Sequence, residues 1–273
     1  MIFYFSGTGN TKWVAQQLAT ATGDSLYFIP DELKKDTLHY ELKEDERLGF
    51  CFPTHGWQPP HIVREFIRRA VFQHSAPASD DQLQPSTYCY AVTTCGDNMG
   101  EAMTILNKEL ALHGLEAETQ FSVIMPESYV CLPFMYTDTP EREREKKEKA
   151  KQDLHLFINK VKERQRCYSR LTKGLTPWTF IHVIGAYFNR FMITDRKFTV
   201  DVNACIHCGR CAKECPVGNI VFADIPLWKR GGDCTCCLSC YHHCPVHAIN
   251  YGSITRKRGQ YYFGHAQGMG KPV

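Results

Sequence analysis

The chain begins Met1-Ile-Phe-Tyr-Phe-Ser6-Gly-Thr-Gly-Asn10-Thr11, an apolar run that leads directly into a turn of small and hydroxylated residues. Residues Ile2–Phe5 show no alternation of apolar and polar side chains, which is typical of a strand buried on both faces. Asn10–Ala21 then predicts a helix, with Trp13, Val14 and Leu18 on its inner side. A strand that passes through a tight turn into a helix is the unit from which parallel sheets are built.

The same rhythm continues to residue 166 and predicts an α/β domain. Helices are expected after Pro59-Pro60, around Met103–Leu110 and over the charge-rich segment Glu141–Arg166, which carries an apolar face at helical spacing. Five strands in this rhythm fit a flavodoxin-like doubly wound parallel sheet, in which ligands bind beyond the carboxyl ends of the strands. The five predicted strands are Ile2–Phe5, Ser25–Ile29, Leu48–Phe52, Tyr88–Thr93 and Phe121–Met125.

The turn after the first strand is a candidate phosphate site. Its small residues let backbone N–H groups converge, its hydroxyls can donate further hydrogen bonds, and the helix N-terminus favours an anion. The glycine spacing fits neither a P-loop nor a dinucleotide fingerprint, and no basic residue precedes Lys12. This combination is typical of a bound monophosphate such as that of FMN. The predicted phosphate-binding residues are Ser6, Gly7, Thr8, Gly9, Asn10 and Thr11.

Two further loops follow the third and fourth predicted strands and emerge at the same sheet edge. Both are rich in small residues, which let the backbone approach a flat ring, and Trp57 could stack on that ring or simply lie on the surface. The predicted ring-binding residues are Pro53, Thr54, His55, Gly56, Trp57, Thr94, Cys95, Gly96 and Asp97.

The chain contains 14 cysteines, and nine of them lie between Cys205 and Cys244. Two runs with the pattern C-x2-C-x2-C-x3-C-P, offset by 29 residues, match the bacterial iron–sulfur pattern in which the fourth cysteine completes the other cluster. A structural zinc site is the alternative, but it does not require the third and fourth cysteines, the proline or the second copy. Cys236 falls outside the pattern. The predicted ligands of one [4Fe–4S] cluster are Cys205, Cys208, Cys211 and Cys244, and those of the other are Cys234, Cys237, Cys240 and Cys215.

These motifs carry resemblances to known families. About residues 1–165 resemble flavodoxins through the phosphate turn and the loops at 54–57 and 94–97, and about residues 198–252 resemble bacterial 2[4Fe–4S] ferredoxins. Together they resemble flavodoxin–ferredoxin fusion proteins. This implies an FMN domain at 1–166, an aromatic connector at 167–197 and a small α+β ferredoxin-like domain at 198–273. It also implies that the Gly56 backbone could flip to hydrogen-bond N5 of reduced flavin.

The parts together predict an electron-transfer protein that passes electrons between FMN, two [4Fe–4S] clusters and a partner redox protein. An FMN-dependent reductase of a small molecule is the alternative, with His55, Tyr129 and Cys95 as candidate acids; a regulatory nucleotide binder with structural clusters is a third.

Composition and charge narrow the other possibilities. A balance of 32 basic to 29 acidic residues gives no case for nucleic-acid binding, and the start of the chain shows no signal peptide, so a cytoplasmic protein without a membrane span is expected. The connector is expected to form a helix that clamps the two domains, or less readily a membrane-surface helix. The segment Tyr251–Val273 is expected either to cover the domain boundary or to dock a partner.

Overall fold

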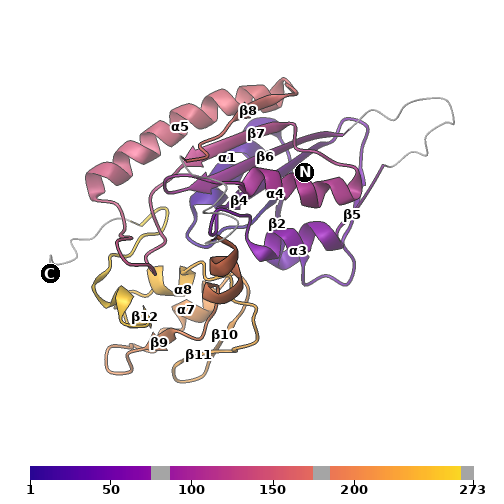
Figure 1. The fold of residues 1–273 in the computed structure, drawn as a ribbon. Helices are drawn as coiled ribbons and strands as arrows, with labels where there is room; N and C mark the ends of the chain where they lie inside the picture. The colour runs from indigo at the N-terminus through magenta and orange to yellow at the C-terminus, as the bar shows by residue number, and fades with distance from the viewer. Residues whose placement is uncertain (75–86, 175–184, 266–273) are drawn as a thin grey trace.

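A computed structural model describes residues 1–74, 87–174 and 185–265 of the chain, in two connected parts (Figure 1). The larger part is built on a six-stranded sheet in the order β2-β1-β4-β6-β7-β8, with every neighbouring pair parallel. Its strands are β1 (Ile2–Tyr4), β2 (Leu26–Phe28), β4 (Arg47–Pro53), β6 (Tyr88–Cys95), β7 (Thr119–Ile124) and β8 (Tyr168–Arg170).

The strand order confirms the predicted flavodoxin-like, doubly wound class, but the sheet has six strands and not five. The sixth, β8, lies in the segment predicted as a connector and pairs with Thr119–Phe121 of β7. Three residues with the sequence Tyr-Ser-Arg are too few to show a strand periodicity, so the pattern of the sequence gave no sign of this edge strand.

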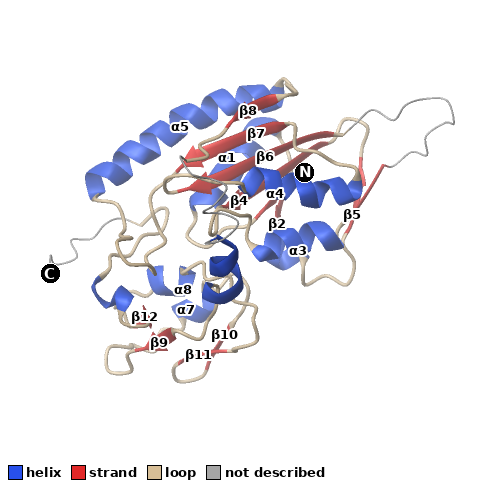
Figure 2. Ribbon diagram, viewed as in Figure 1, coloured by secondary structure: helices blue, strands red, loops and turns tan. Residues whose placement is uncertain are grey.

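Helices cover both faces of the sheet (Figure 2). On one face, α1 (Asn10–Thr22) and α5 (Pro140–Lys162) pack over the sheet through side chains that include Val14 and Phe157. On the other, Phe3, Phe50 and Phe66 form the centre of a second apolar core. The elements on this second side are α2 (Ile29–Glu32), α3 (His61–Arg69), α4 (Ala102–Leu110), η1 (Ala111–His113) and the small parallel pair of β3 (His39–Leu42) and β5 (Val71–His74).

The smaller part repeats one unit twice. Each cysteine run ends in a short helix that leads to a strand, and the equivalent strands begin at Ile220 and Ile249, which matches the 29-residue offset of the sequence repeat. β12 pairs antiparallel with β9, and β10 pairs antiparallel with β11. The elements are β9 (Phe198–Val200), α7 (Arg210–Lys213), β10 (Ile220–Phe222), β11 (Pro226–Trp228), α8 (Ser239–His242), β12 (Ile249–Tyr251) and η4 (Ile254–Lys257).

The connector contacts both parts of the molecule. The helical turn η3 (Phe188–Met192) places the buried Phe188 against Tyr129, with ring centroids 5.4 Å apart. The first half of the helix expected in the connector falls at 175–184, outside the described residues. Within the described ranges, no helix is long and apolar enough to cross a membrane.

Candidate functional site

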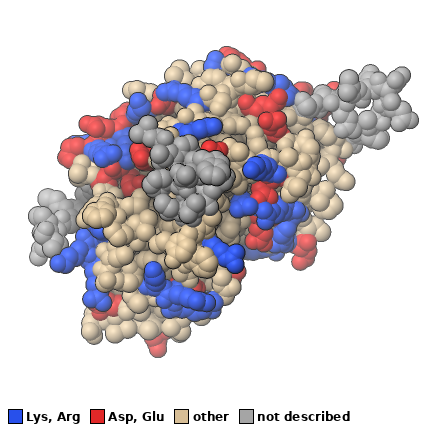
Figure 3. Space-filling model, viewed as in Figure 1, with Lys and Arg blue, Asp and Glu red and all other residues tan. Residues whose placement is uncertain are grey.

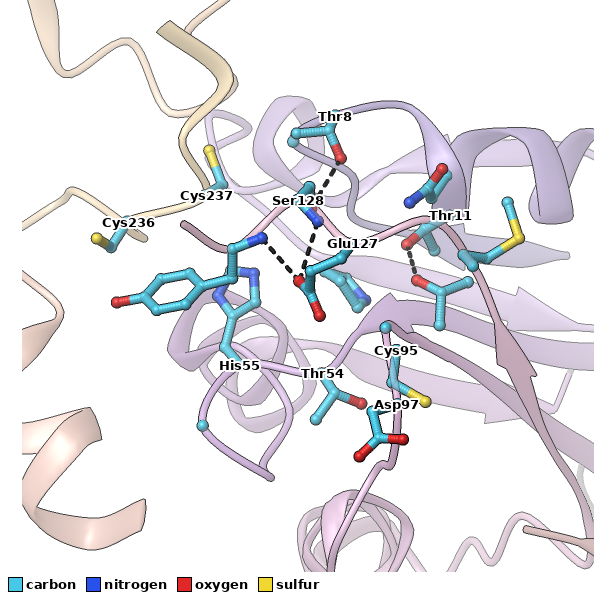
Figure 4. A pocket seen from close by; sticks show the side chains of 18 of the residues that line it. Thr8, Thr11, Thr54, His55, Cys95, Asp97, Glu127, Ser128, Cys236 and Cys237 are labelled. Atoms are coloured by element: carbon cyan, nitrogen blue, oxygen red, sulfur yellow. Dashed lines mark hydrogen bonds between the residues drawn. The ribbon is translucent and has the colours of Figure 1, made fainter. Parts of the chain in front are cut away.

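A cavity of about 260 Å³ lies beyond the carboxyl ends of β1, β4 and β6, where the two parts of the molecule meet (Figure 4). Fourteen of the fifteen residues predicted to bind flavin line this cavity. The exception is Gly9, which is covered by Phe263. The Cβ of Phe263 lies 3.0 Å from the position that a Cβ on Gly9 would occupy. The three predicted loops are therefore brought together at one site.

The turn at residues 6–11 has the geometry of an anion cradle. Gly9 takes a left-handed backbone, with φ of 94°, and its N–H donates to the Ser6 hydroxyl at 3.1 Å. Helix α1 begins at the next residue, so its first N–H groups lie beside the cavity. The hydroxyls of Thr11 and Thr94 lie 2.7 Å apart and connect this turn to the end of β6.

The loop after β4 is a tight turn whose backbone faces the cavity. His55 and Gln58 exchange two backbone hydrogen bonds of 2.9 and 3.1 Å, and Gly56 and Trp57 between them both have positive φ. This is the pattern of a type I′ turn. Asn189 of η3 donates to the Gly56 carbonyl at 3.2 Å, so the connector holds this turn from outside.

A fourth loop, Met125–Tyr129, completes the cavity. Figure 4 shows the Glu127 carboxylate directed into the pocket, facing Cys95 and Asp97. Its Oε1 accepts hydrogen bonds from the N–H groups of Ser128 and Tyr129 at 2.9 and 2.8 Å. Burial nevertheless raises the pKa of Glu127, because desolvation disfavours the charged form.

Asp138 and Lys146 fix the position of this carboxylate loop. The Asp138 carboxylate accepts from the Glu127 N–H at 2.7 Å and from the Lys146 ammonium at 2.6 Å, and Lys146 also donates to the Gly96 carbonyl at 3.0 Å. From the sequence, this segment is also expected to border either the cofactor or the second domain, because it follows the fifth predicted strand; it is not among the predicted ring-binding residues, and it lines the cavity.

The smaller part of the molecule supplies another wall of the cavity through Thr235, Cys236 and Cys237. Cys237 is pressed against the phosphate turn: its Cβ and Sγ lie 2.5 and 3.0 Å from the place that a Cβ on Gly7 would occupy. The ring of His55 contacts the Thr235 backbone, and burial at this boundary lowers the pKa of His55 to about 4.

The eight patterned cysteines form two sets. One set, called the outer cysteine set, consists of Cys205, Cys208, Cys211 and Cys244. It lines a separate small hollow together with Ile206, Pro245 and Val246. The cavity-side cysteine set also lies together. Burial raises the pKa of Cys240, and its close neighbours Cys237, Cys234 and Cys215 raise it further. The cavity-side set is Cys215, Cys234, Cys237 and Cys240.

The fourth cysteine of each repeat thus lies with the first three of the other repeat. Its sulfur also accepts an equivalent backbone hydrogen bond in both copies, from Asn219 to Cys215 at 3.3 Å and from Ala248 to Cys244 at 3.2 Å. Among the described residues, no three His, Cys, Asp or Glu side chains form a group able to hold a single metal ion.

The segment at 259–265 packs over the outside of the turn at residues 6–11, which agrees with the covering role, one of the two expected for it. The Tyr261 hydroxyl donates to the Asn10 side chain at 2.6 Å, and the Phe263 N–H donates to the Thr8 carbonyl at 2.7 Å. The Phe263 ring stacks on Trp13 with centroids 5.3 Å apart.

His242 ties the same region to the fourth loop. Its Nδ1 accepts the Tyr261 N–H at 3.1 Å, so its Nε2 carries the proton and donates to the Ser128 carbonyl at 2.6 Å.

Comparison with known proteins supports iron–sulfur binding by the first of the two cysteine runs. Residues 197–220, which include four of the patterned cysteines, match a family model described as a 4Fe-4S binding domain. No curated protein matches the chain.

Among solved structures, the chain is similar to a candidate flavoprotein from Bacteroides uniformis, with 15% identity, 45% of this chain and 88% of that chain covered, and a TM-score of 0.31. It is also similar to the Trp repressor binding protein from Bacillus subtilis, with 10% identity, 62% and 100% covered, and the same TM-score. The fold class rests on the strand order of the chain itself.

Proposed function

We propose that this chain is an electron-transfer protein that holds FMN in the cavity between its two parts and two [4Fe–4S] clusters in its cysteine sets, and that exchanges electrons with a partner redox protein. One observation carries the proposal: Cys237 of the cavity-side set lines the same cavity as the three loops that end β1, β4 and β6. The proposal divides the chain into an FMN domain at 1–166, a connector at 167–197 and a cluster domain at 198–273.

The residues around the cavity suit FMN. The phosphate would lie on the turn that Ser6, Thr8 and Thr11 provide, where neutral hydroxyls and the start of α1 offer donors without a basic side chain. Gly56 and Gly96 both line the cavity, and a side chain at either would overlap Phe188 or the Glu127 carboxylate, so both positions require glycine. When bound, FMN supplies chemistry that exchanges electrons singly or in pairs, whereas each cluster exchanges one.

The side chains of the chain set the conditions in this cavity. The Glu127 carboxylate places negative charge at the site, which is one of the means by which a protein lowers a flavin's potential. Phe188, Leu132 and Met135 form an apolar side of the cavity, which limits the access of water. The N–H groups of Asn219 and Ala248 donate hydrogen bonds to cysteine sulfurs and would shift the potentials of bound clusters, because such bonds are among the features that set them.

The test is to purify the protein without oxygen, measure bound FMN, iron and acid-labile sulfide, and titrate it with a one-electron reductant while recording spectra. One FMN with eight irons per chain is the expected result, because each cluster contains four irons. Zinc in place of iron, or a tightly bound nucleotide other than FMN, would overturn the proposal. Reduction of a small oxidant by the loaded protein much faster than by free FMN would favour the reductase alternative.

A further inference from the structure

The two cysteine sets differ in what surrounds them. In the cavity-side set, Cys237 lines the flavin cavity and lies against Gly7 of the phosphate turn. No member of the outer set lines that cavity, and all four surround the separate hollow in the smaller part. The first set therefore lies between the flavin cavity and the rest of the cluster domain.

The outer set reaches the protein surface through one of its four cysteines, Cys208. Cys208 is exposed, and the hollow is rimmed by Ile206 and Val246, which are 57% and 38% exposed. Cys205 is partly exposed, and the other two members of the outer set, Cys211 and Cys244, are buried. No member of the cavity-side set is as exposed as Cys208. An exposed ligand with an apolar rim gives another protein a surface on which to dock directly against the cluster.

The charge of this part indicates the kind of partner. Residues 198–262 contain seven Lys and Arg against four Asp and Glu. Figure 3 shows Lys and Arg gathered over the lower part of the molecule, where the cluster domain lies. Surface Lys and Arg attract an acidic partner and speed its association at low salt, and this attraction has to outweigh the negative charge that the two bound clusters with their thiolates would bring.

We infer that electrons follow a fixed order, from the flavin cavity to the cavity-side set and then to the outer set, and that the rim of Ile206 and Val246 docks an acidic one-electron redox protein. The inference rests on the proposed function. Two electrons leave the reduced flavin one at a time, its protons pass to solvent, and the two clusters together accept both electrons. Each later step oxidises the outer cluster and reduces the docked partner by one electron, with no atom transferred.

The order is tested in the full-length protein, loaded anaerobically with FMN, iron and sulfide. The flavin is reduced by a light pulse, cluster signals are followed by electron paramagnetic resonance after rapid freezing, and rubredoxin serves as an acidic acceptor. In Cys208→Ser we expect the flavin to reduce the cavity-side cluster as in the wild type, while rubredoxin reduction falls at least tenfold. In Cys237→Ser we expect neither cluster to be reduced from the flavin.

Two results would overturn the order of the sets. One is full-rate rubredoxin reduction by Cys208→Ser, and the other is reduction of the outer cluster from the flavin in Cys237→Ser. Iron and sulfide counts show how many clusters each variant keeps. If a cysteine variant loses both clusters, the wild-type protein still decides the order, because the signal of the cavity-side cluster must form before that of the outer cluster.

The docking surface is tested without touching a cysteine. Val246→Asp is expected to slow rubredoxin reduction about tenfold at low salt, with flavin-to-cluster transfer unchanged. Leu112→Asp is the matched control, because Leu112 is 66% exposed on η1 of the sheet domain, far along the chain from the cysteine sets.

An equal loss in both variants, no loss in either, or faster reduction of the basic cytochrome c than of rubredoxin would refute the assigned surface. A wild-type protein that binds no FMN or no iron would instead refute the proposed function.

Discussion

Gly7→Ala is the substitution that most directly tests how the two parts of the molecule meet. The backbone of Gly7 does not have a positive φ, so alanine meets no conformational strain there. Its methyl group would, however, lie 2.5 Å from the Cβ of Cys237, whereas carbon atoms in contact lie about 3.5–4.0 Å apart. The loop that carries Cys237 must therefore retreat by roughly 1 Å.

The expected cost follows from that displacement. Forcing one methyl group into a well-packed contact destabilises a protein by about 1–3 kcal/mol. Because Cys237 is a proposed cluster ligand and a wall of the flavin cavity, we expect Gly7→Ala to lower the free energy of unfolding by that amount, to weaken FMN binding and to slow electron transfer between flavin and cluster. Anaerobic urea unfolding, FMN titration and flash photolysis measure the three effects.

Gly231→Ala provides the control, because Gly231 lies in the same cysteine-bearing part and a Cβ there would meet only Asp233 at 3.7 Å. That variant should behave as the wild type. If Gly7→Ala retained wild-type stability, FMN affinity and transfer rate, the close contact between the phosphate turn and Cys237 would not exist in solution.

Three further predictions concern single side chains at the site. Glu127→Gln removes a negative charge from the cavity and should raise the reduction potential of bound FMN, as measured by spectroscopic titration, whereas Glu65→Gln on the exposed side of α3 should leave it unchanged. The pKa of His55 is about 4, below its ordinary value of 6.5, so the unfolded chain binds the extra proton first and the free energy of unfolding should fall as the pH drops from 6.5 to 4. His55→Gln should remove roughly 1–3 kcal/mol of that fall, as measured by urea unfolding. An unchanged pH profile in this variant would contradict the assignment. Tyr261→Phe removes the hydrogen bond to Asn10 and should cost about 0.5–1.5 kcal/mol in unfolding and weaken FMN binding measured by fluorescence; equal affinity would show that this contact does not support the phosphate turn.

The sequence alone predicted the elements whose signals are local. The buried strand Ile2–Phe5 and the turn after it indicate the first βα unit. The regular alternation of strand and helix patterns that follows predicts the parallel sheet. The cysteine spacing predicted which cysteines lie together, because in this repeated pattern the fourth cysteine of each run joins the first three of the other run. The three loops around the cavity could be grouped because parallel strands end at one sheet edge.

What the sequence did not show depends on contacts between distant segments. The edge strand Tyr168–Arg170 is too short to have a period, and its pairing with β7 decides its structure. That Cys236 and Cys237 line the cavity beyond the sheet follows from the docking of the two parts, which no local pattern encodes. The same holds for the hydrogen bond between Tyr261 and Asn10, which joins residues 251 positions apart.

That last contact has a consequence for biosynthesis. A chain is made from its N-terminus at about 5–20 residues per second, and N-terminal domains generally fold first. The sheet domain can thus form while the segment that covers its phosphate turn, Tyr261 and Phe263, is still inside the ribosome. Until that segment emerges, the outer side of the turn is open to the surroundings. The protein therefore has an interval during synthesis in which the cofactor proposed for this turn could enter from the side that the finished molecule closes.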